Sequence, residues 1–220
     1  MSYNMHGLAG PSAALEATVR AAAPAVLVIQ ECLRWTATRS WWADLAGRFG
    51  MARMDGGLSA RGNAVLTSGQ VAVDRSWVVR YPWRLGGSPR AAVFVRASHG
   101  GSRFVVAGTH LDTHPATRLR EATAFKAALD EVPDPVVVGI DVNETPGGAA
   151  WEVVAAGLVD AALPSGQGGT PTYPTGAPRR RIDAVFVDPR VTVRGYAVPN
   201  TATTRAASDH FPVVVDVDLP

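Results

Sequence analysis

The chain has 220 residues, of which 47% are hydrophobic and 18% are charged, and its formal net charge is +2 at pH 7. This length suits one well-formed core, so we expect a single domain over residues 1–220. The one cysteine, Cys32, excludes an internal disulfide and a zinc site built on cysteines, and its apolar neighbours predict a buried thiol.

The ends and apolar runs of the sequence bear on its location. No run approaches the length of a membrane span, and no basic segment followed by an apolar stretch opens the chain. We expect a cytoplasmic monomer without stable membrane association, or a secreted protein if a signal peptide has been removed.

Arginine dominates the positive charge, since Lys126 is the only lysine among the 21 basic residues. A GC-rich coding sequence explains this preference without any function, but arginine is also the better bidentate ligand for phosphate. If several acids gather around a metal, the remaining surface is more basic than the net charge indicates. The composition therefore permits a polyanionic partner such as DNA or RNA without requiring one.

The first half of the chain predicts short strands separated by two helices. A very short strand ends near Met5, and a helix follows over 8–20, with Ser12 as a possible N-cap. The apolar run 25–31 predicts a strand buried on both faces. A helix over 40–48 places Trp41, Trp42 and Leu45 on its apolar side. Further strands are expected at 63–67, 71–80, 91–97 and 103–109.

The second half predicts helices at 116–129 and 148–156 around a strand at 136–140. A loop rich in Gly, Pro, Ser and Thr occupies 164–178, and loops of this length are often functional. Strands follow at 182–187, 191–197 and 213–219. Several hairpins with a few interspersed helices fit two packed sheets flanked by helices, an α/β fold.

Polar side chains recur where the predicted strands begin or end: Asn4, Glu31, His110, Asp112, Asp141, Asn143, Asp183, Asp209 and His210. Taken singly, Asn4 fits a turn and Asp141 an Asx-turn. Likewise, Glu31 fits a solvated strand end, Asp183 a surface ion pair, and His114 an ordinary surface histidine. Chance does not readily place so many at strand ends, and one shared edge would gather them into an acidic pocket.

Gathered carboxylates repel one another and raise each other's pKa unless a cation neutralises them. Carboxylate and amide oxygens select hard ions, so the sequence predicts Mg²⁺ or Mn²⁺, with Ca²⁺ as an alternative. A histidine beside such a site is suited to touch a phosphate or to move a proton.

Seven segments in order resemble the endonuclease/exonuclease/phosphatase superfamily, which includes pancreatic-type deoxyribonuclease. They are SYNMHG, VIQEC, GNAVLTS, GTHLDTHP, GIDVNETPGGAAW, RRRIDAVFV and ASDHFPVVVDV, and they span nearly the whole chain. The resemblance implies a four-layer α/β/β/α sandwich of two mostly antiparallel sheets flanked by helices. It also implies metal-dependent cleavage of phosphate esters by a single catalytic domain.

The resemblance implies that one group of these residues binds the metal. Glu31 corresponds to the principal metal carboxylate, with Asn4 close to it and Asp209 as a further ligand. Asp141 corresponds to the group that orients or deprotonates the attacking water, or that binds a second metal. Asp209 and His210 are then adjacent because one serves the metal and the other serves the phosphate.

The resemblance also implies that a second group of residues binds the phosphate. Asn143 holds a phosphate oxygen, and His210 stabilises the charge that develops in the transition state, with Asp183 as its orienting partner. His110 corresponds to a second histidine near the phosphate, whose acidic partner the sequence does not assign.

The substrate stays open at this point. A nuclease or related phosphodiesterase is the first hypothesis; a phosphatase or a sphingomyelinase-like lipid phosphodiesterase is the alternative. A non-catalytic phosphate-binding protein on the same scaffold is the third. Arg179 and Arg180 are candidates to bind phosphates flanking the scissile one, or form a solvated charge run together with Arg181. The stretch 81–87, YPWRLGG, predicts either an ordinary hairpin or an aromatic surface for a base or a membrane.

Overall fold

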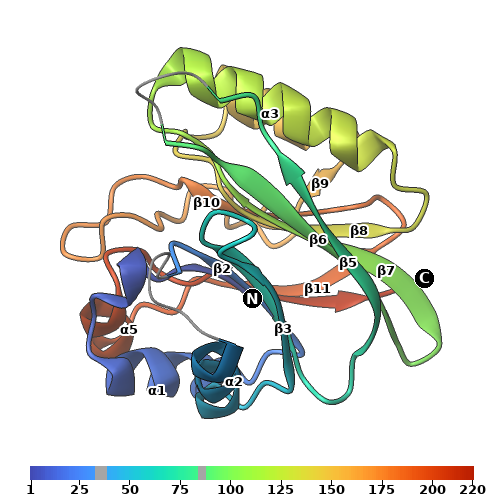
Figure 1. Cartoon of the computed structure of the whole chain (residues 1–220). Helices are drawn as coiled ribbons and strands as arrows, with labels where there is room; N and C mark the ends of the chain where they lie inside the picture. Colours follow the sequence, from blue (N-terminus) through green and yellow to red (C-terminus); the bar gives the residue numbers. More distant parts are fainter. Residues whose placement is uncertain (33–38, 84–87) are drawn as a thin grey trace.

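The computed structural model describes residues 1–32, 39–83 and 88–220 of the chain (Figure 1). Residues 84–87, the end of the stretch 81–87 that predicts an ordinary hairpin or an aromatic surface, lie outside the described residues. No helix in the described part combines the length and apolar character that a membrane crossing requires.

Two sheets form the centre of the molecule. The first has the order β1 (Ser2–Asn4), β2 (Val26–Gln30), β4 (Asn63–Thr67) and β3 (Arg53–Gly57). The second has the order β5 (Ala72–Arg80), β6 (Ala91–His99), β7 (Ser102–His110), β8 (Val136–Asp141), β10 (Asp183–Val187) and β9 (Val159–Asp160). A further pair, β11 (Thr192–Ala197) and β12 (Val214–Asp218), adjoins β1 through an antiparallel bridge between Ser2 and Val213.

Helices cover the outer faces of the two sheets. In Figure 1, α3 (Pro115–Asp130) lies along the six-stranded sheet, and the short α4 (Ala149–Ala155) packs into the same core. On the other side lie α1 (Ser12–Ala22), α2 (Arg39–Arg48) and α5 (Ala202–Ala207). Valines from both sheets form the layer between them. The predicted four-layer sandwich of two mostly antiparallel sheets is therefore confirmed.

Two glycines let the sheets approach closely. A Cβ atom on Gly108 of β7 would lie 2.6 Å from Val28 Cγ1, and one on Gly139 of β8 would lie 2.7 Å from Val28 Cβ. Only glycine fits at such a distance without a shift of the neighbouring strand. The contact holds the first sheet against the centre of the second, next to the ends of β7 and β8.

Several local predictions need correction. The first α-helix begins at Ser12 rather than residue 8; its N-cap is Pro11, so Ser12 is not the cap. A separate 3-10 turn, η1 (His6–Leu8), precedes it, with φ values of 46° at His6 and 61° at Leu8. Strands β3 and β9 and helix α5 were not expected. The burial of Cys32 and of Leu45 is confirmed, and Trp41 and Trp42 pack against the same core.

Candidate active site

Strand register places three of the predicted site residues in a row. Strands β7 and β8 are parallel, with His110 opposite Asp141. Strands β8 and β10 are antiparallel, with Asp183 opposite Asp141. All three side chains are deeply buried, with side-chain exposures of 6%, 1% and 2%. The ends of three adjacent strands thus bring one imidazole and two carboxylates to the same edge of the sheet.

The first sheet contributes Asn4 and Glu31 to this edge. Strands β1 and β2 are parallel, so Asn4 lies opposite Gln30, the residue before Glu31. The Asn4 side-chain amide donates to Glu31 Oε1 at 3.0 Å and to Asp141 Oδ2 at 2.9 Å, while its Oδ1 accepts the His6 backbone N–H at 3.0 Å. Asn4 therefore links the carboxylates of the two sheets through a fully buried side chain.

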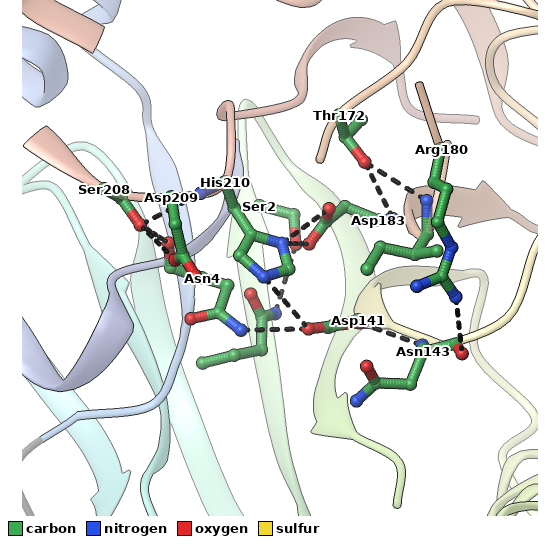
Figure 2. A network of polar contacts seen from close by, with 12 residues as sticks. Ser2, Asn4, Asp141, Asn143, Thr172, Arg180, Asp183, Ser208, Asp209 and His210 are labelled. Atoms are coloured by element: carbon green, nitrogen blue, oxygen red, sulfur yellow. Dashed lines mark hydrogen bonds and ion pairs between the residues drawn. The ribbon is translucent and has the colours of Figure 1, made fainter. Parts of the chain in front are cut away.

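His210 reaches the row from the segment between α5 and β12 (Figure 2). Its Nδ1 lies 3.0 and 2.9 Å from the two oxygens of Asp183, and its Nε2 lies 3.9 Å from Asp141 Oδ2. Burial lowers the pKa of His210, but the charge and hydrogen bond of Asp183, with further contributions from Asp141 and Asp209, raise it to about 10. The imidazole is therefore protonated at neutral pH and presents an N–H towards Asp141.

Asp141 is the central carboxylate of the site. Burial and the neighbouring charge of Asp183 raise its pKa to about 7, against the lowering effects of His210, Asn4 and the Asn143 backbone N–H. An added cation would favour the ionised carboxylate and lower this pKa. The Asp141 carboxylate can therefore either accept a proton or bind a cation.

His110 and Asn143 form the other side of the centre. The Asn143 amide nitrogen lies 2.8 Å from His110 Nε2 and donates to the Leu111 carbonyl at 2.9 Å. Two carboxylates approach His110: Asp141 Oδ2 at 3.4 Å from Nε2 and Glu31 Oε1 at 3.8 Å from Nδ1. The acidic neighbours of His110 that the sequence left unassigned are therefore Asp141 and Glu31.

Asp209 lies at the rim rather than in the buried row. Its Oδ1 is 3.6 Å from His6 Nδ1, and 36% of its side chain is exposed. Asp112, another strand-end residue, faces away, because its carboxylate accepts the His114 backbone N–H at the start of α3. His114 is an exposed residue at the N-cap of that helix, as an ordinary histidine would be.

The three consecutive arginines separate into two environments. Arg179 and Arg180 are exposed, and Arg180 Nη2 lies 3.5 Å from the Asn143 carbonyl oxygen. Arg181 is buried, pairs with both oxygens of Asp160 at 3.1 and 2.5 Å, and lies over the Trp151 ring. Arg181 serves the fold, which leaves the other two at the edge of the site.

Two residues of the loop 164–178 that the sequence did not single out support the centre. The Thr172 hydroxyl accepts the backbone N–H groups of Ile182 at 3.1 Å and of Asp183 at 3.2 Å (Figure 2). The Tyr173 ring lies 4.6 Å from the His210 ring. The unusual length of this loop was the one sequence feature that pointed to it.

The donor set fits a hard divalent cation. Glu31 and Asp141 converge on the Asn4 amide, and Asp141 and Asp183 offer carboxylate oxygens within 4.8 Å of each other, whereas the protonated His210 beside them donates a hydrogen bond instead of binding a metal. Oxygen donors of this kind suit Mg²⁺ or Mn²⁺. A bound cation would offset the repulsion that raises the pKa of Asp141.

Solved structures share this fold along the whole chain. A functionally unknown conserved protein from Enterococcus faecalis V583 is 18% identical with a TM-score of 0.81, covering 100% of this chain and 98% of that one. A mannosyl-6-phosphatase from Bacteroides thetaiotaomicron is 16% identical with a TM-score of 0.79, covering 99% and 98%. TDP2 from D. rerio, complexed with a single strand DNA product, is 19% identical with a TM-score of 0.80, covering 99% and 97%.

Identities this low establish a common fold and leave the substrate open. No curated protein matches the sequence. The model of the Endonuclease/Exonuclease/phosphatase family, however, matches residues 1–210, which include every residue of the site described above. The chain therefore belongs to the endonuclease/exonuclease/phosphatase family and is an enzyme that hydrolyses phosphate esters.

Proposed function

We propose that this chain is a single-domain, divalent-metal-dependent phosphodiesterase that cleaves nucleic acid. The observation that carries the choice of substrate is the exposed Arg180 beside Asn143, with the exposed Arg179 next to it in the chain. In a phosphate monoester the reacting phosphate is terminal, whereas the reacting diester of a polynucleotide is flanked by further phosphates. Cations outside the buried centre are suited to those flanking charges.

Glu31 and Asp141 are proposed to hold the Mg²⁺ or Mn²⁺ ion, with Asn4 and Asp209 as further ligands. When bound, the ion would offset the negative charge of the phosphate diester that repels a nucleophile. In this structure the Asn4 amide presents its nitrogen to both carboxylates. To act as a ligand through Oδ1, the amide would have to exchange its nitrogen and oxygen positions and give up the His6 backbone N–H.

Asp141 is also the proposed base or orienting group for the attacking water. The Asn4 amide and the Asn143 backbone N–H hold its buried carboxylate in place, and with a cation bound the carboxylate would be ionised and able to accept a proton. Water attacks phosphorus as its proton moves towards the carboxylate, and the bond to the leaving oxygen breaks on the opposite side. The leaving oxygen takes a proton from solvent, and Asp141 releases the proton it accepted to solvent, so hydrolysis yields one phosphate monoester and one hydroxyl.

His210, His110 and Asn143 are proposed to bind the phosphoryl oxygens. His210 is the fixed cation of this group, because Asp183 keeps it protonated and fixes its Nδ1. Its Nε2–H is therefore available to the charge that grows on the phosphoryl oxygens in the transition state. Asp183 acts through His210 and is a positioning residue.

Hydrolysis of several phosphate esters tests the proposal. The wild type is incubated with Mg²⁺ or Mn²⁺ at low salt and given duplex DNA, single-stranded DNA, RNA, sphingomyelin, inositol phosphates or a hexose 6-phosphate. Bis-p-nitrophenyl phosphate serves as a diester without flanking phosphates. We expect cleavage of the small diester and of a nucleic acid. If neither DNA nor RNA is cut, the phosphatase or lipid phosphodiesterase alternative replaces the nuclease.

The double substitution Arg179→Gln/Arg180→Gln tests the binding of flanking phosphates. It is expected to flatten the dependence of log affinity on log salt by roughly 0.9 for each duplex phosphate that the protein no longer neutralises. Arg103→Gln is the matched control, because Arg103 is exposed and lies near the start of β7, at the opposite end from His110. An unchanged salt slope in the double variant would remove these arginines from the phosphate-binding surface.

A further inference from the structure

A second group of arginines lines a hollow outside the centre described above. The hollow has a volume of about 310 Å³ and is lined by Arg61, Arg80, Tyr81, Trp83, Pro89 and Arg90. We call these six residues the arginine hollow. Its size is at the lower end of the range of small-molecule pockets, ~300–1,000 Å³.

Backbone and side-chain contacts place the arginine hollow next to the candidate active site. The Tyr81 hydroxyl lies 2.6 Å from Thr109 Oγ1, and Thr109 directly precedes His110. On the other side, the carbonyl oxygen of Gly62, the residue after Arg61, accepts the Cys32 backbone N–H at 2.8 Å. Because Cys32 follows Glu31, the hollow borders the centre on the side of His110 and Glu31.

The arginines of the hollow form no ion pair within the described part of the chain. Arg61 and Arg80 are exposed and Arg90 is half-buried, whereas the less exposed Arg96 and Arg118 each pair with a carboxylate, that of Asp134 and that of Glu144. The three guanidinium groups of the hollow have no carboxylate within 4.0 Å among the described residues, and no acid lines the hollow. Nε of Arg90 is buried and has no hydrogen-bond partner there. Neighbouring guanidinium groups repel one another, and a bound anion would relieve that repulsion.

Trp83 adds an aromatic surface to this cationic site. It is 57% exposed, the second most exposed of the large hydrophobic side chains in the described residues. Aromatic rings beside cations are the usual means of binding unpaired bases, because each base offers a flat face for stacking. The quaternary ammonium of a phosphocholine headgroup can also lie on an aromatic ring, but the three arginines of the hollow would repel it, whereas a base carries no positive charge.

The two arginine groups lie on opposite sides of the centre. Arg180 contacts Asn143, which follows β8, whereas the arginine hollow lies beyond β7 towards β5 and β6. The buried row of His110, Asp141 and Asp183 separates them. A linear polyanion that crosses this row would meet cations before and after the scissile phosphate.

We propose that the arginine hollow is a nucleotide subsite for single-stranded nucleic acid, in which an unpaired base stacks on Trp83. Arg61 and Arg80 bind the phosphate next to the scissile one. This inference rests on the proposed nuclease function and specifies its substrate as a polynucleotide that extends on both sides of the cleaved bond.

Binding of labelled oligonucleotides tests the subsite without relying on turnover. All variants carry His210→Ala, so that the probe stays intact. The probes are a fluorescein-labelled single-stranded DNA of 12 nucleotides and its 12-base-pair duplex, with fluorescence anisotropy measured across a salt series. Trp83→Ala is expected to raise the Kd for the single strand by about 5- to 150-fold and to change duplex binding little. Arg61→Gln/Arg80→Gln is expected to reduce the salt slope for the single strand by about 0.7, the change for one phosphate that is no longer neutralised.

The outcomes distinguish a failure of the proposed subsite from a failure of the proposed nuclease function. Arg103→Gln in the same background is the control for the removal of one exposed arginine. If the hollow variants bind the single strand as this control does, while the enzyme with His210 intact cuts DNA, the subsite is wrong and the nuclease stands. An equal weakening of single-strand and duplex binding in Trp83→Ala would contradict stacking of an unpaired base. If the enzyme with His210 intact cuts no nucleic acid, the function and the subsite fall together.

Discussion

The pair of Asp183 and His210 makes a prediction about pH. Asp183→Asn keeps the size of the side chain and an oxygen that can accept from His210 Nδ1, but removes the negative charge. In the wild type, the pKa of His210 is raised from 6.5 to about 10, so the imidazole is protonated below that pH and loses its proton only above it. Without the Asp183 charge, the pKa falls and protonation is lost at a lower pH.

The size of the effect follows from the two pKa values. Burial, the largest influence, lowers the pKa of His210, and without the Asp183 charge the smaller effects of Asp141 and Asp209 oppose it, so we expect the pKa to return at least to its ordinary value of about 6.5. At that pKa, about 75% of the imidazole is protonated at pH 6 and about 3% at pH 8, whereas the wild type stays protonated at both. The ratio of variant to wild-type kcat should therefore fall by about 25-fold from pH 6 to pH 8.

The measurement is kcat for bis-p-nitrophenyl phosphate with saturating Mg²⁺ at half-unit steps of pH. Taking the ratio to the wild type cancels the pH dependence that the two enzymes share. Asp183 also raises the pKa of Asp141, and saturating Mg²⁺ keeps that carboxylate ionised in both enzymes. Asp188→Asn is the matched control, since Asp188 directly follows the same strand β10 and pairs with Arg190 instead of His210. A constant ratio from pH 6 to pH 8 would show that Asp183 does not act through the charge of His210. A ratio near one throughout would remove Asp183 from the mechanism.

Two further predictions concern the metal and the fold. Excess chelator should abolish hydrolysis, and Mg²⁺ or Mn²⁺ should restore it; full activity in chelator would contradict the metal site. Glu31→Gln should weaken Mg²⁺ binding by at least about tenfold in calorimetric titration. Arg181→Met should lower the free energy of unfolding in urea by about 3–5 kcal/mol, because it leaves Asp160 buried without its partner. Adding Asp160→Asn should recover part of that stability, since the uncompensated charge is removed; a cost below about 1 kcal/mol for Arg181→Met alone would show that the pair does not stabilise the fold.

The sequence by itself determined the fold class and where to look for the chemistry. Continuous apolar runs such as 25–29 and 136–140 predict strands, because a strand that is buried on both faces requires apolar side chains along its length. A polar residue at the end of such a run, such as Glu31 or Asp141, marks the point where the chain leaves the core. The family motifs strengthen the prediction of the fold and of the reaction, because they occur in the family's order along nearly the whole chain.

Strands and helices that lack a periodic apolar pattern were not predicted from the sequence. Strand β3, Arg53–Gly57, contains two glycines and two charged residues, and it is extended because β4 offers it a partner edge. Helix α5 is too short for apolar periodicity, although the capping box of Thr201 and Thr204 was a local sign of its start. Here pairing and capping, rather than hydrophobic patterning, specify the local structure.

Only the tertiary structure decided how the polar residues combine. His110, Asp141 and Asp183 come together because parallel and antiparallel pairing align the ends of β7, β8 and β10, and no local spacing encodes that register. The three arginines 179–181 look alike in sequence, yet Arg181 is buried because Asp160, 21 residues earlier, supplies its partner. Charge pairing and strand register join residues far apart in the chain, so both depend on distances that exist only in the folded protein.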